Sequence, residues 1–214
     1  MQRLASLFFI GGSVFLMSFT TPATVNKGEK PTKAATTRKA TVFQVDVKES
    51  KLSWTGKKVT GQHQGTINLA DGKLEVESNV LKGGSFSLDT RSIAVTDIKD
   101  EGSNAKLLGH LKSEDFFSVE KFPAASFATT SVTSKGGGNY EVTGNLTIKG
   151  ITNPVTFPAT VTVAGNKLTA KAAIKVDRTK YNIKYGSKSF FEGIGDKAIY
   201  DDFDLDVVLV ANAK

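Results

Sequence analysis

The stretch Asp202-Phe203-Asp204-Leu205-Asp206-Val207-Val208-Leu209, near the end of the 214-residue chain, decides the fold. Its apolar side chains stand at every second position from Phe203 to Leu209; Asp202 precedes them, and Asp204, Asp206 and Val208 fill the positions between them. Successive side chains of a β-strand point to opposite faces, so one face of this segment is apolar and the other polar. That pattern is typical of an antiparallel strand with a core on one side and water on the other.

The same alternation recurs in three other segments. Residues 74–80, 140–148 and 168–176 each place apolar or small side chains at alternate positions. Together with the spacing of the turn residues, these segments predict eight or nine strands in total.

Turn-forming residues separate these segments. Asp71-Gly72 and Gly165-Asn166 predict two-residue hairpin turns, because both pairs tolerate positive φ angles. Residues 136–139, with the sequence Gly-Gly-Gly-Asn, predict a looser turn. Gly83-Gly84 interrupts a strand-like stretch, where glycine often marks a bulge or a sharp bend.

One segment departs from the alternation. Residues 103–111 begin with Ser103 and Asn104, which favour helix starts, and carry three leucines on one side, so we predict a short helix there. Many short antiparallel strands with a single short helix predict an all-β fold, either a barrel or a sandwich. A closed barrel has the advantage that it leaves no exposed strand edge.

Three regions follow one another along the chain. Residues 1–23 have the composition of a secretory signal peptide: Met1-Gln2-Arg3 is a short basic start, an apolar run follows, and small residues lead to Ala23. Residues 24–41 are rich in Thr, Ala and Lys without apolar periodicity, so we expect a flexible linker. Residues 42–212 then form one domain with a sizeable core. We therefore expect export, to the periplasm or the extracellular space.

Cysteine content and charge narrow the function. The chain has no cysteine, so stability must come from packing without disulfides. Residues 1–41 contain six basic side chains against one acidic, whereas the remainder has 22 basic and 20 acidic side chains. Because the domain itself is nearly balanced in charge, we expect no nucleic-acid partner.

Residues that could carry catalysis are few. His63 and His110 lie in separate segments at no metal-ligand spacing, and no HExxH, Walker, nucleophile-elbow or Rossmann motif occurs. We expect His110 to hydrogen-bond locally at a helix end. The aspartates of the last strand alternate with apolar residues, which favours a solvated outer face. We therefore predict no enzyme, no metal and no cofactor.

Two further motifs are similar to a known family. Residues 111–127, Leu-Lys-Ser-Glu-Asp-Phe-Phe-Ser-Val-Glu-Lys-Phe-Pro-Ala-Ala-Ser-Phe, resemble a hallmark of the YceI-like domain. So do residues 142–157, which contain Val-Thr-Gly-Asn-Leu-Thr-Ile-Lys-Gly followed by Ile-Thr-Asn-Pro-Val-Thr-Phe. The resemblance implies a lipocalin-like antiparallel β-barrel that is exported, is compatible with a homodimer, and holds an isoprenoid or another amphiphile in an elongated pore. Residues 52–63 and 178–191 depart from the lipid-binding members, so the resemblance carries over the fold better than the ligand.

The predicted binding residues are mainly aromatic. Most large apolar side chains fill the core of a protein, but small inward residues such as Gly144, Ala170 and Ala172 would leave a barrel hollow. The predicted lining of the cavity or its mouth consists of Trp54, Phe86, Phe116, Phe117, Phe127, Leu146, Phe157, Tyr181, Tyr185, Phe190 and Phe191.

Two adjacent phenylalanine pairs suggest a mouth. Phe116-Phe117 and Phe190-Phe191 cannot both point inward from a strand, so we expect them to form an apolar gate, with ordinary loop packing as the alternative. The candidates for contact with a polar head group are His63, Arg178, Lys184 and Lys188. For Arg178, an ion pair with Asp177 or Asp97 is the favoured alternative.

The sequence thus predicts an exported carrier whose barrel cavity holds an isoprenoid, a quinone or a fatty-acid-like molecule, with only transient membrane contact. One alternative is a structural or stress-related interaction protein with a closed core and no ligand. The weaker alternative is a hydrolase or isomerase that uses His63 with a carboxylate.

Overall fold

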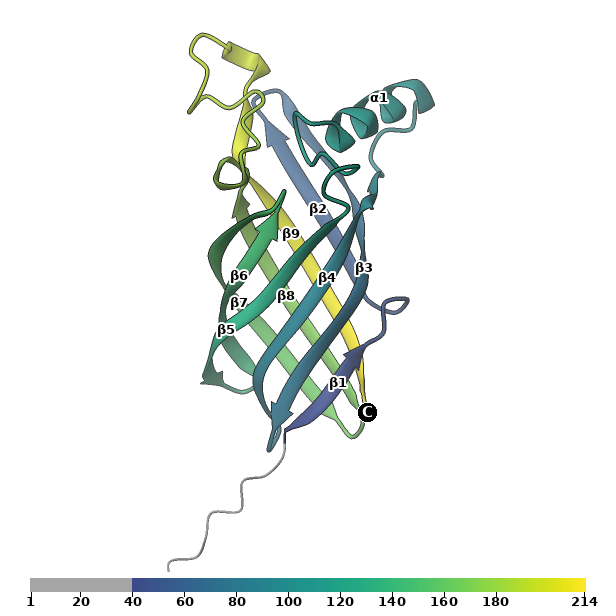
Figure 1. Ribbon diagram of the computed structural model, residues 1–214, viewed down its shortest axis with the longest axis vertical. Coiled ribbons are helices and arrows are strands. Elements are labelled where there is room, and N and C mark those ends of the chain that lie inside the picture. The colour runs from purple at the N-terminus through teal and green to yellow at the C-terminus, as the bar shows by residue number, and fades with distance from the viewer. Residues whose placement is uncertain (1–39) are drawn as a thin grey trace, which may run out of the picture. The chain divides into compact units, whose positions relative to one another are not determined.

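The computed structural model describes residues 40–214, and these form a closed barrel with one α-helix at one end (Figure 1). The predicted signal peptide and all but the last two residues of the predicted linker lie outside the described residues. The elements are β1 (Thr41–Val45), β2 (Lys51–Lys58), β3 (Gly61–Glu77), β4 (Val80–Val95), α1 (Glu101–Lys112), β5 (Ala124–Gly136), β6 (Asn139–Ile148), β7 (Ile151–Ala164), β8 (Lys167–Asp177), the short 3₁₀ helices η1 (Arg178–Tyr181) and η2 (Gly195–Lys197), and β9 (Ile199–Ala213).

The strands close into a ring in which all neighbours are antiparallel. The order is β3-β2-β9-β8-β7-β6-β5-β4, and β4 pairs back to β3. β1 pairs with the far end of β3 and with the end of β9, so β1 and β2 share one strand position that residues 46–50 interrupt. The prediction of an all-β, lipocalin-like antiparallel barrel is confirmed, and the sandwich alternative is not formed.

The alternation of the last strand has the predicted consequence. Leu205 of β9 lies opposite Trp54 of β2 and Ile174 of β8, so apolar side chains of three strands meet on the inner face. Asp204 lies on the outer face and binds Lys57 and Lys175 of the neighbouring strands at 2.7 and 2.9 Å. Period two therefore separates a hydrocarbon interior from a charged exterior.

Two turn predictions are confirmed and one is wrong. Gly165, with φ 59°, turns β7 into β8, and the glycines at 137 and 138 connect β5 to β6. Asp71-Gly72 instead lies inside β3, where a Cβ on Gly72 would stand 2.7 Å from Cδ1 of Phe86. The turn occurs at Ser78 and Asn79, both at positive φ, so the alternating segment predicted at 74–80 is divided between two strands.

Irregular pairing occurs where the glycine pair predicted it. Glu75 pairs with Gly83 but Val76 pairs with Leu81, so the register slips by one residue beside Gly83-Gly84. This confirms the predicted bulge, and such bulges increase the local twist that a closed barrel requires.

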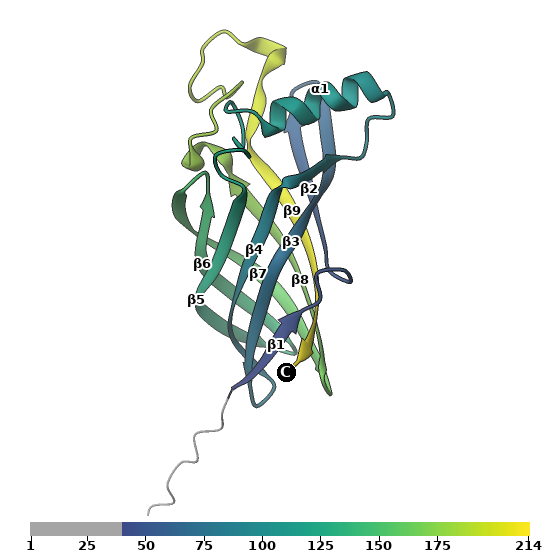
Figure 2. The same cartoon turned by 45° about the vertical axis from the view of Figure 1, so that its right-hand side comes forward.

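The helix begins earlier than predicted. α1 starts at Glu101, and its N-cap is Asp100, whose Oδ1 accepts a hydrogen bond from the Ser103 amide at 2.8 Å. Leu111 is its buried residue, and α1 packs against β4 at the barrel end opposite the C-terminus (Figures 1 and 2). We call the end that carries α1 the upper end.

Candidate functional site: a two-part apolar cavity

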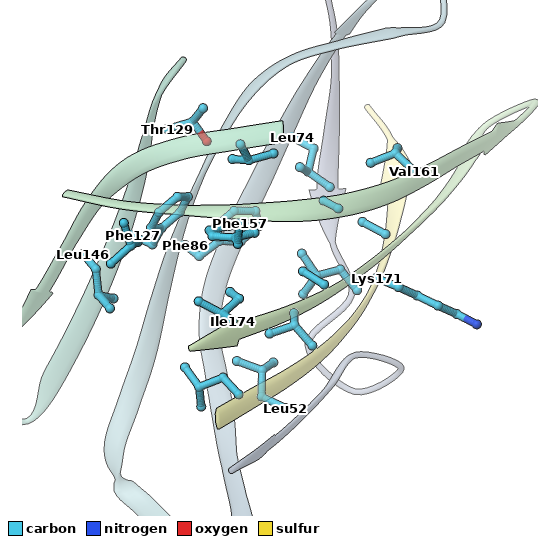
Figure 3. Close-up of a pocket in the computed structure, with 18 of the residues that line it drawn as sticks. Leu52, Leu74, Phe86, Phe127, Thr129, Leu146, Phe157, Val161, Lys171 and Ile174 are labelled. Atoms are coloured by element: carbon cyan, nitrogen blue, oxygen red, sulfur yellow. The ribbon is translucent and has the colours of Figure 1, made fainter. Parts of the chain in front are cut away.

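The barrel interior contains two cavities with apolar walls. The lower cavity, of about 110 Å³, is lined chiefly by leucines, valines and phenylalanines of β2 to β9 (Figure 3). The upper cavity, of about 120 Å³, lies between the upper strand ends, the residues after α1 and the segment that precedes β9. Such cavities favour hydrocarbon over water, because they offer water few hydrogen-bond partners.

One layer of leucines belongs to both cavities. Leu88 of β4, Leu146 of β6 and Leu205 of β9 line the lower and the upper cavity alike, so the two spaces lie end to end. Each cavity is somewhat smaller than the roughly 150 Å³ apolar cavity that accepts benzene. A long apolar chain would therefore need both cavities and would pass this leucine layer.

The lower end of the barrel is closed by well-packed side chains. Phe43 of β1 pairs with Leu74 of β3 and with Ala213 of β9, and it is almost fully buried. Leu168 and Ala211, which face each other across β8 and β9, have no exposed surface. These buried residues form the floor of the barrel in the part of the chain that the structure describes.

The small inward residues Ala170 and Ala172 leave open space in the barrel, whereas Gly144 does not. Ala170 and Ala172 line the lower cavity, in agreement with the sequence analysis. At Gly144, however, a Cβ would stand 2.2 Å from Cζ of Phe127 and 2.6 Å from the Ala128 carbonyl oxygen. The expectation that Gly144 leaves open space is therefore wrong, because the Phe127 ring occupies that space.

In the wall of the lower cavity, the pairing between β7 and β8 covers only part of the two strands. The ladder between these strands ends at the pair Ala159–Ala172, although both strands continue toward the upper end. β7 carries Pro154 and Pro158 in this part, and proline has no amide hydrogen to donate. Lys171, whose amine points away from the other lining side chains in Figure 3, lies at this edge of the cavity.

The structure brings most predicted apolar residues into the cavity walls. The predicted residues of the lower wall are Phe86, Phe127, Leu146 and Phe157, and those of the upper wall are Trp54, Phe116, Phe117 and again Leu146. Phe127 contacts the rings of Phe86 and Phe157, with centroids 6.3 and 5.5 Å away.

The first phenylalanine pair lies at the upper cavity. Phe116 and Phe117 follow α1 in an irregular segment, which lets two adjacent rings face the same space. Phe116 is buried beside His110, and Phe117 meets Phe203 edge to face with centroids 6.4 Å apart. His110 also binds Asp115 at 3.1 Å, which confirms the local hydrogen bond expected for it.

Four predicted aromatic residues lie away from the two cavity walls. Tyr181 is 1% exposed, and burial raises the pKa of its hydroxyl, which has no hydrogen-bond partner among residues 40–214. Tyr185, Phe190 and Phe191 are about half exposed on the segment between η1 and β9. These three form part of the outer surface of the upper end.

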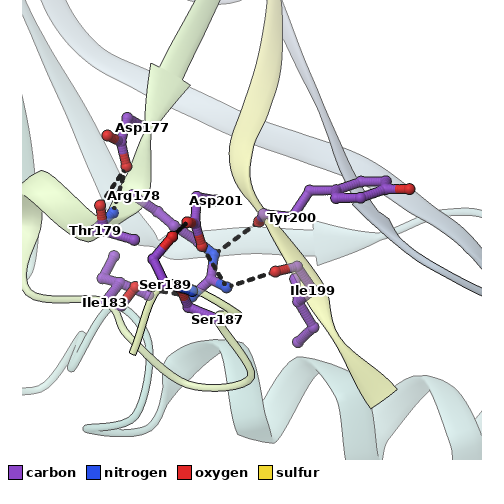
Figure 4. A network of polar contacts seen from close by, with 9 residues as sticks. All are labelled: Asp177, Arg178, Thr179, Ile183, Ser187, Ser189, Ile199, Tyr200 and Asp201. Atoms are coloured by element: carbon purple, nitrogen blue, oxygen red, sulfur yellow. Dashed lines mark hydrogen bonds and ion pairs between the residues drawn. The ribbon is translucent and has the colours of Figure 1, made fainter. Parts of the chain in front are cut away.

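Arg178 lines the upper cavity and is bound to the backbone of neighbouring segments. It is 4% exposed, and its guanidinium donates to three backbone carbonyls, those of Ile183 at 2.8 Å, Tyr200 at 3.0 Å and Ile199 at 3.1 Å (Figure 4). The expected ion pair with Asp177 or Asp97 is wrong, because the facing carboxylate is Asp201, 3.7 Å from Nη2. Burial lowers the pKa of Arg178, and the charges of Asp201 and Asp177 oppose that shift. Arg178 therefore joins the chain before and after the segment 184–198.

Asp201 is held ionised by its neighbours. Burial would raise its pKa, but the neighbouring hydroxyls of Ser187 and Ser189 and the charge of Arg178 hold the pKa below its usual value. The Ser189 hydroxyl donates to Oδ2 at 2.5 Å. The 3.7 Å separation from Arg178 is too long for a hydrogen bond, so this pair acts through charge.

The remaining head-group candidates lie on the surface. His63, near the start of β3, has Nδ1 2.9 Å from Oδ2 of Asp97. Lys184 stands over the Phe190 ring at 4.6 Å, and Lys188 is exposed. Within residues 40–214 there is no group of three histidine, cysteine or acidic side chains placed to hold a metal ion.

Sequence reasoning missed part of the cavity wall. Leu52, Leu88, Ile174 and Leu205 line the cavities but were not among the predicted binding residues. Leu205 and Ile174 stand on the apolar faces of alternating segments, so the period-two signal already contained them. They were left out because the predicted binding residues were chosen mainly among aromatic side chains.

A closed antiparallel barrel with an apolar interior, one floor and an upper end made of loops defines a lipocalin-like binding fold. The chain belongs to the YceI-like domain family, whose model matches residues 43–211. The family resemblance in the sequence is thereby confirmed. None of the helices in the part of the chain that the structure describes is long and apolar enough to cross a membrane.

The chain is similar to several bacterial proteins. A UPF0312 protein of Shewanella denitrificans is 36% identical over 95 residues, which are 44% of this chain and 47% of that protein. A UPF0312 protein of Vibrio parahaemolyticus is 40% identical over 90 residues, 39% of this chain and 48% of that protein. The chain thus spans about half the length of the curated relatives it matches.

Solved structures share the fold. BcnA of Burkholderia cenocepacia superposes with a TM-score of 0.64 at 25% identity, over 78% of this chain and 99% of that one. A polyisoprenoid binding domain from Saccharophagus degradans, implicated in plant cell wall breakdown, superposes with a TM-score of 0.58 over 80% of this chain and 98% of that one. The second is 13% identical, so that likeness concerns the fold alone.

Proposed function

We propose that this protein is an exported, non-catalytic carrier that holds the apolar tail of an amphiphile, such as an isoprenoid, a quinone or a fatty-acid-like molecule, in its two-part cavity. The observation that carries the proposal is the leucine layer shared by two apolar cavities. An extended hydrocarbon chain fits a space of this form, whereas a compact polar molecule would leave its hydrogen bonds unmade.

The energetics of such binding need no polar anchor. A tail that buries about 400 Å² of apolar surface gains about 10 kcal/mol at 25 cal/mol per Å². Association and ordering consume about 4–15 kcal/mol, so a tail of this size is near the threshold of useful affinity from burial alone. The polar head would then remain at the upper end, because the floor of Phe43, Leu168 and Ala211 closes the other.

The likeness to other proteins supports the ligand class. The Saccharophagus degradans domain with this fold is described as binding polyisoprenoid, and the chain belongs to the YceI-like family. Export rests on the basic and apolar composition of residues 1–23. Fractionation of cells that produce the whole chain would test it, and a product found only in the cytoplasm at full length would refute export.

Tail uptake can be followed with the protein's own fluorescence. Trp54 is the single tryptophan and lines the upper cavity, so its emission should change when a tail fills that space. We expect titration with a short-chain quinone to quench Trp54 to saturation, and native mass spectrometry to show one bound molecule. No saturable change with a quinone, a polyprenol or a fatty acid would refute the carrier function.

A pair of variants makes the assay specific. Leu146→Arg places a charge in the leucine layer and should abolish uptake, because an unpaired charge in an apolar cavity draws in water or remains unsatisfied. Val208→Arg puts the same side chain on the exposed outer face of β9 and should leave uptake unchanged. Circular dichroism must show both variants β-rich. If Leu146→Arg is folded and still takes up the tail, the cavity assignment is wrong.

A further inference from the structure

The segment from Lys184 to Ala198 forms a loop that projects from the upper end of the barrel. We call residues 184–198 the apical loop; Figures 1 and 2 show it beyond the strand ends, opposite the C-terminus. Ile183 immediately before it and Ile199 immediately after it both line the upper cavity. The apical loop is therefore part of the rim of the cavity.

A network of hydrogen bonds fixes the base of this loop. Arg178 donates to the carbonyls of both Ile183 and Ile199, and the Ile199 amide donates to the Gly186 carbonyl at 2.8 Å. Asp201 accepts from Ser189 within the loop (Figure 4). The loop is thus held in one orientation at its base, and its tip faces away from the strands.

The loop presents two apolar rings to the outside. Phe190 and Phe191 are 48% and 49% exposed, and the amides of both donate to the Ser187 carbonyl in a tight turn. Tyr185 and Tyr200, at the two sides of the loop, are 47% and 53% exposed. Exposed aromatic side chains such as the adjacent Phe190 and Phe191 favour contact with an apolar partner.

Lysines lie before and after these rings in the sequence. Lys180, Lys184, Lys188 and Lys197 outnumber Glu192 and Asp196 in residues 180–200, and none of the four lysines forms an ion pair with a described residue. The Lys184 amine stands 4.6 Å from the centre of the Phe190 ring. Aromatic rings beside free lysines are the composition of segments that lie in the headgroup layer of an anionic membrane.

We propose that the apical loop docks this protein on the surface of an anionic lipid bilayer, with Phe190 and Phe191 inserted among the headgroups and the lysines on the lipid phosphates. Docking in this orientation turns the rim of the upper cavity toward the lipid, because Ile183 and Ile199 join the loop directly to that cavity. The surface is independent of the cavity contents, so it does not require the proposed ligand.

Vesicle binding of the ligand-free protein tests the inference. We expect co-sedimentation with vesicles of phosphatidylcholine mixed with phosphatidylglycerol, weaker binding to phosphatidylcholine alone, and release by salt. Phe190→Ser with Phe191→Ser should lower the partition coefficient at least about tenfold, because two apolar rings leave the interface. The matched control, Val80→Ser with Val208→Ser, removes two exposed apolar side chains elsewhere and should bind as the unaltered protein does.

A second set of variants covers the case in which the double serine variant folds poorly. Lys184→Gln and Lys188→Gln should each weaken binding about fivefold, since a lysine near an anionic surface contributes about that factor. Because the chain has no cysteine, Phe191→Cys can be labelled with an environment-sensitive dye, whose emission should shift to the blue on mixed vesicles. The same dye at Val80→Cys should not shift.

The outcomes are distinct from those of the carrier experiment. No vesicle binding by the unaltered protein, equal binding by the serine variant and its control, or equal dye shifts at positions 191 and 80 would each overturn the docking surface. Vesicles without quinone or polyprenol are used throughout. Loss of docking with intact quinone quenching of Trp54 therefore leaves the carrier function standing, and the reverse result leaves the docking surface standing.

Discussion

Truncation of the leucine layer gives the sharpest test of whether the interior is hollow. Leu146→Ala removes hydrocarbon that is buried between two cavities. Loss of its burial costs about 2–3 kcal/mol of unfolding free energy at about 0.8 kcal/mol per methylene. A further cost arises only where the removed atoms had close neighbours, and Leu146 already borders open space above and below. We expect a total near 2–3 kcal/mol.

Leu168→Ala is the matched control. Leu168 has no exposed surface and lies in the floor, where neighbours surround it on all sides. The same truncation there leaves a new cavity and should cost about 3–5 kcal/mol. With a urea m-value of about 2 kcal/mol per molar, the two midpoints should differ by roughly half to one molar.

The assay is urea unfolding with and without a saturating quinone. A ligand at 100 times its dissociation constant adds about 2.7 kcal/mol to the stability of a protein that binds it only when folded. Leu146→Ala should keep this gain and should accept a bulkier tail, because the layer between the cavities is then wider. If Leu146→Ala costs as much as Leu168→Ala, the layer is solidly packed and the continuous tail site is refuted.

Three further predictions concern polar residues. Arg178→Met should cost about 3–5 kcal/mol and expose the apical loop to proteases, because three carbonyls and Asp201 lose their buried cation; stability and cleavage unchanged from the unaltered protein would contradict this. Hydrogen bonds from Lys57 and Lys175 lower the pKa of Asp204. Below about pH 4 the unfolded chain therefore binds more protons than the folded one, so the unfolding free energy should fall as the pH is lowered through this range. In Asp204→Asn the unfolding free energy, measured by urea unfolding across pH, should fall less below about pH 4. An unchanged fall would show that other carboxylates cause it. His63→Ala should change tail affinity less than about threefold, because its contact with Asp97 is a surface pair; a large loss in quinone titration would restore the alternative in which His63 acts chemically.

Strands could be predicted from the sequence more reliably than turns. Alternation identified β6, β8 and β9 because each buries a full face, which makes side-chain polarity follow the pleat. It failed at Asp71-Gly72, where a sequence suited to a turn is extended inside β3. Gly72 is required there by the close approach of Phe86 and Val45, a tertiary contact that no local pattern contains.

The site shows the same division. Phe86, Phe127, Leu146 and Phe157 were predictable as wall residues, since large apolar side chains on alternating strands must face a closed interior. The outward position of Phe190 and Phe191 was not predictable in the same way, because they lie in a loop whose direction is set at its base by Arg178. An aromatic side chain carries no local signal of whether it lines a cavity or meets solvent.

By itself the sequence determined an antiparallel all-β domain of the YceI-like family with an apolar inner face, because period two and motif residues are local properties of the chain. Only the tertiary structure decided that the interior contains two cavities joined at Leu88, Leu146 and Leu205, and that Arg178 supports the base of the apical loop. The physical reason is that voids and buried hydrogen bonds depend on how distant strands approach one another. That distance is a result of barrel closure, not of any one segment.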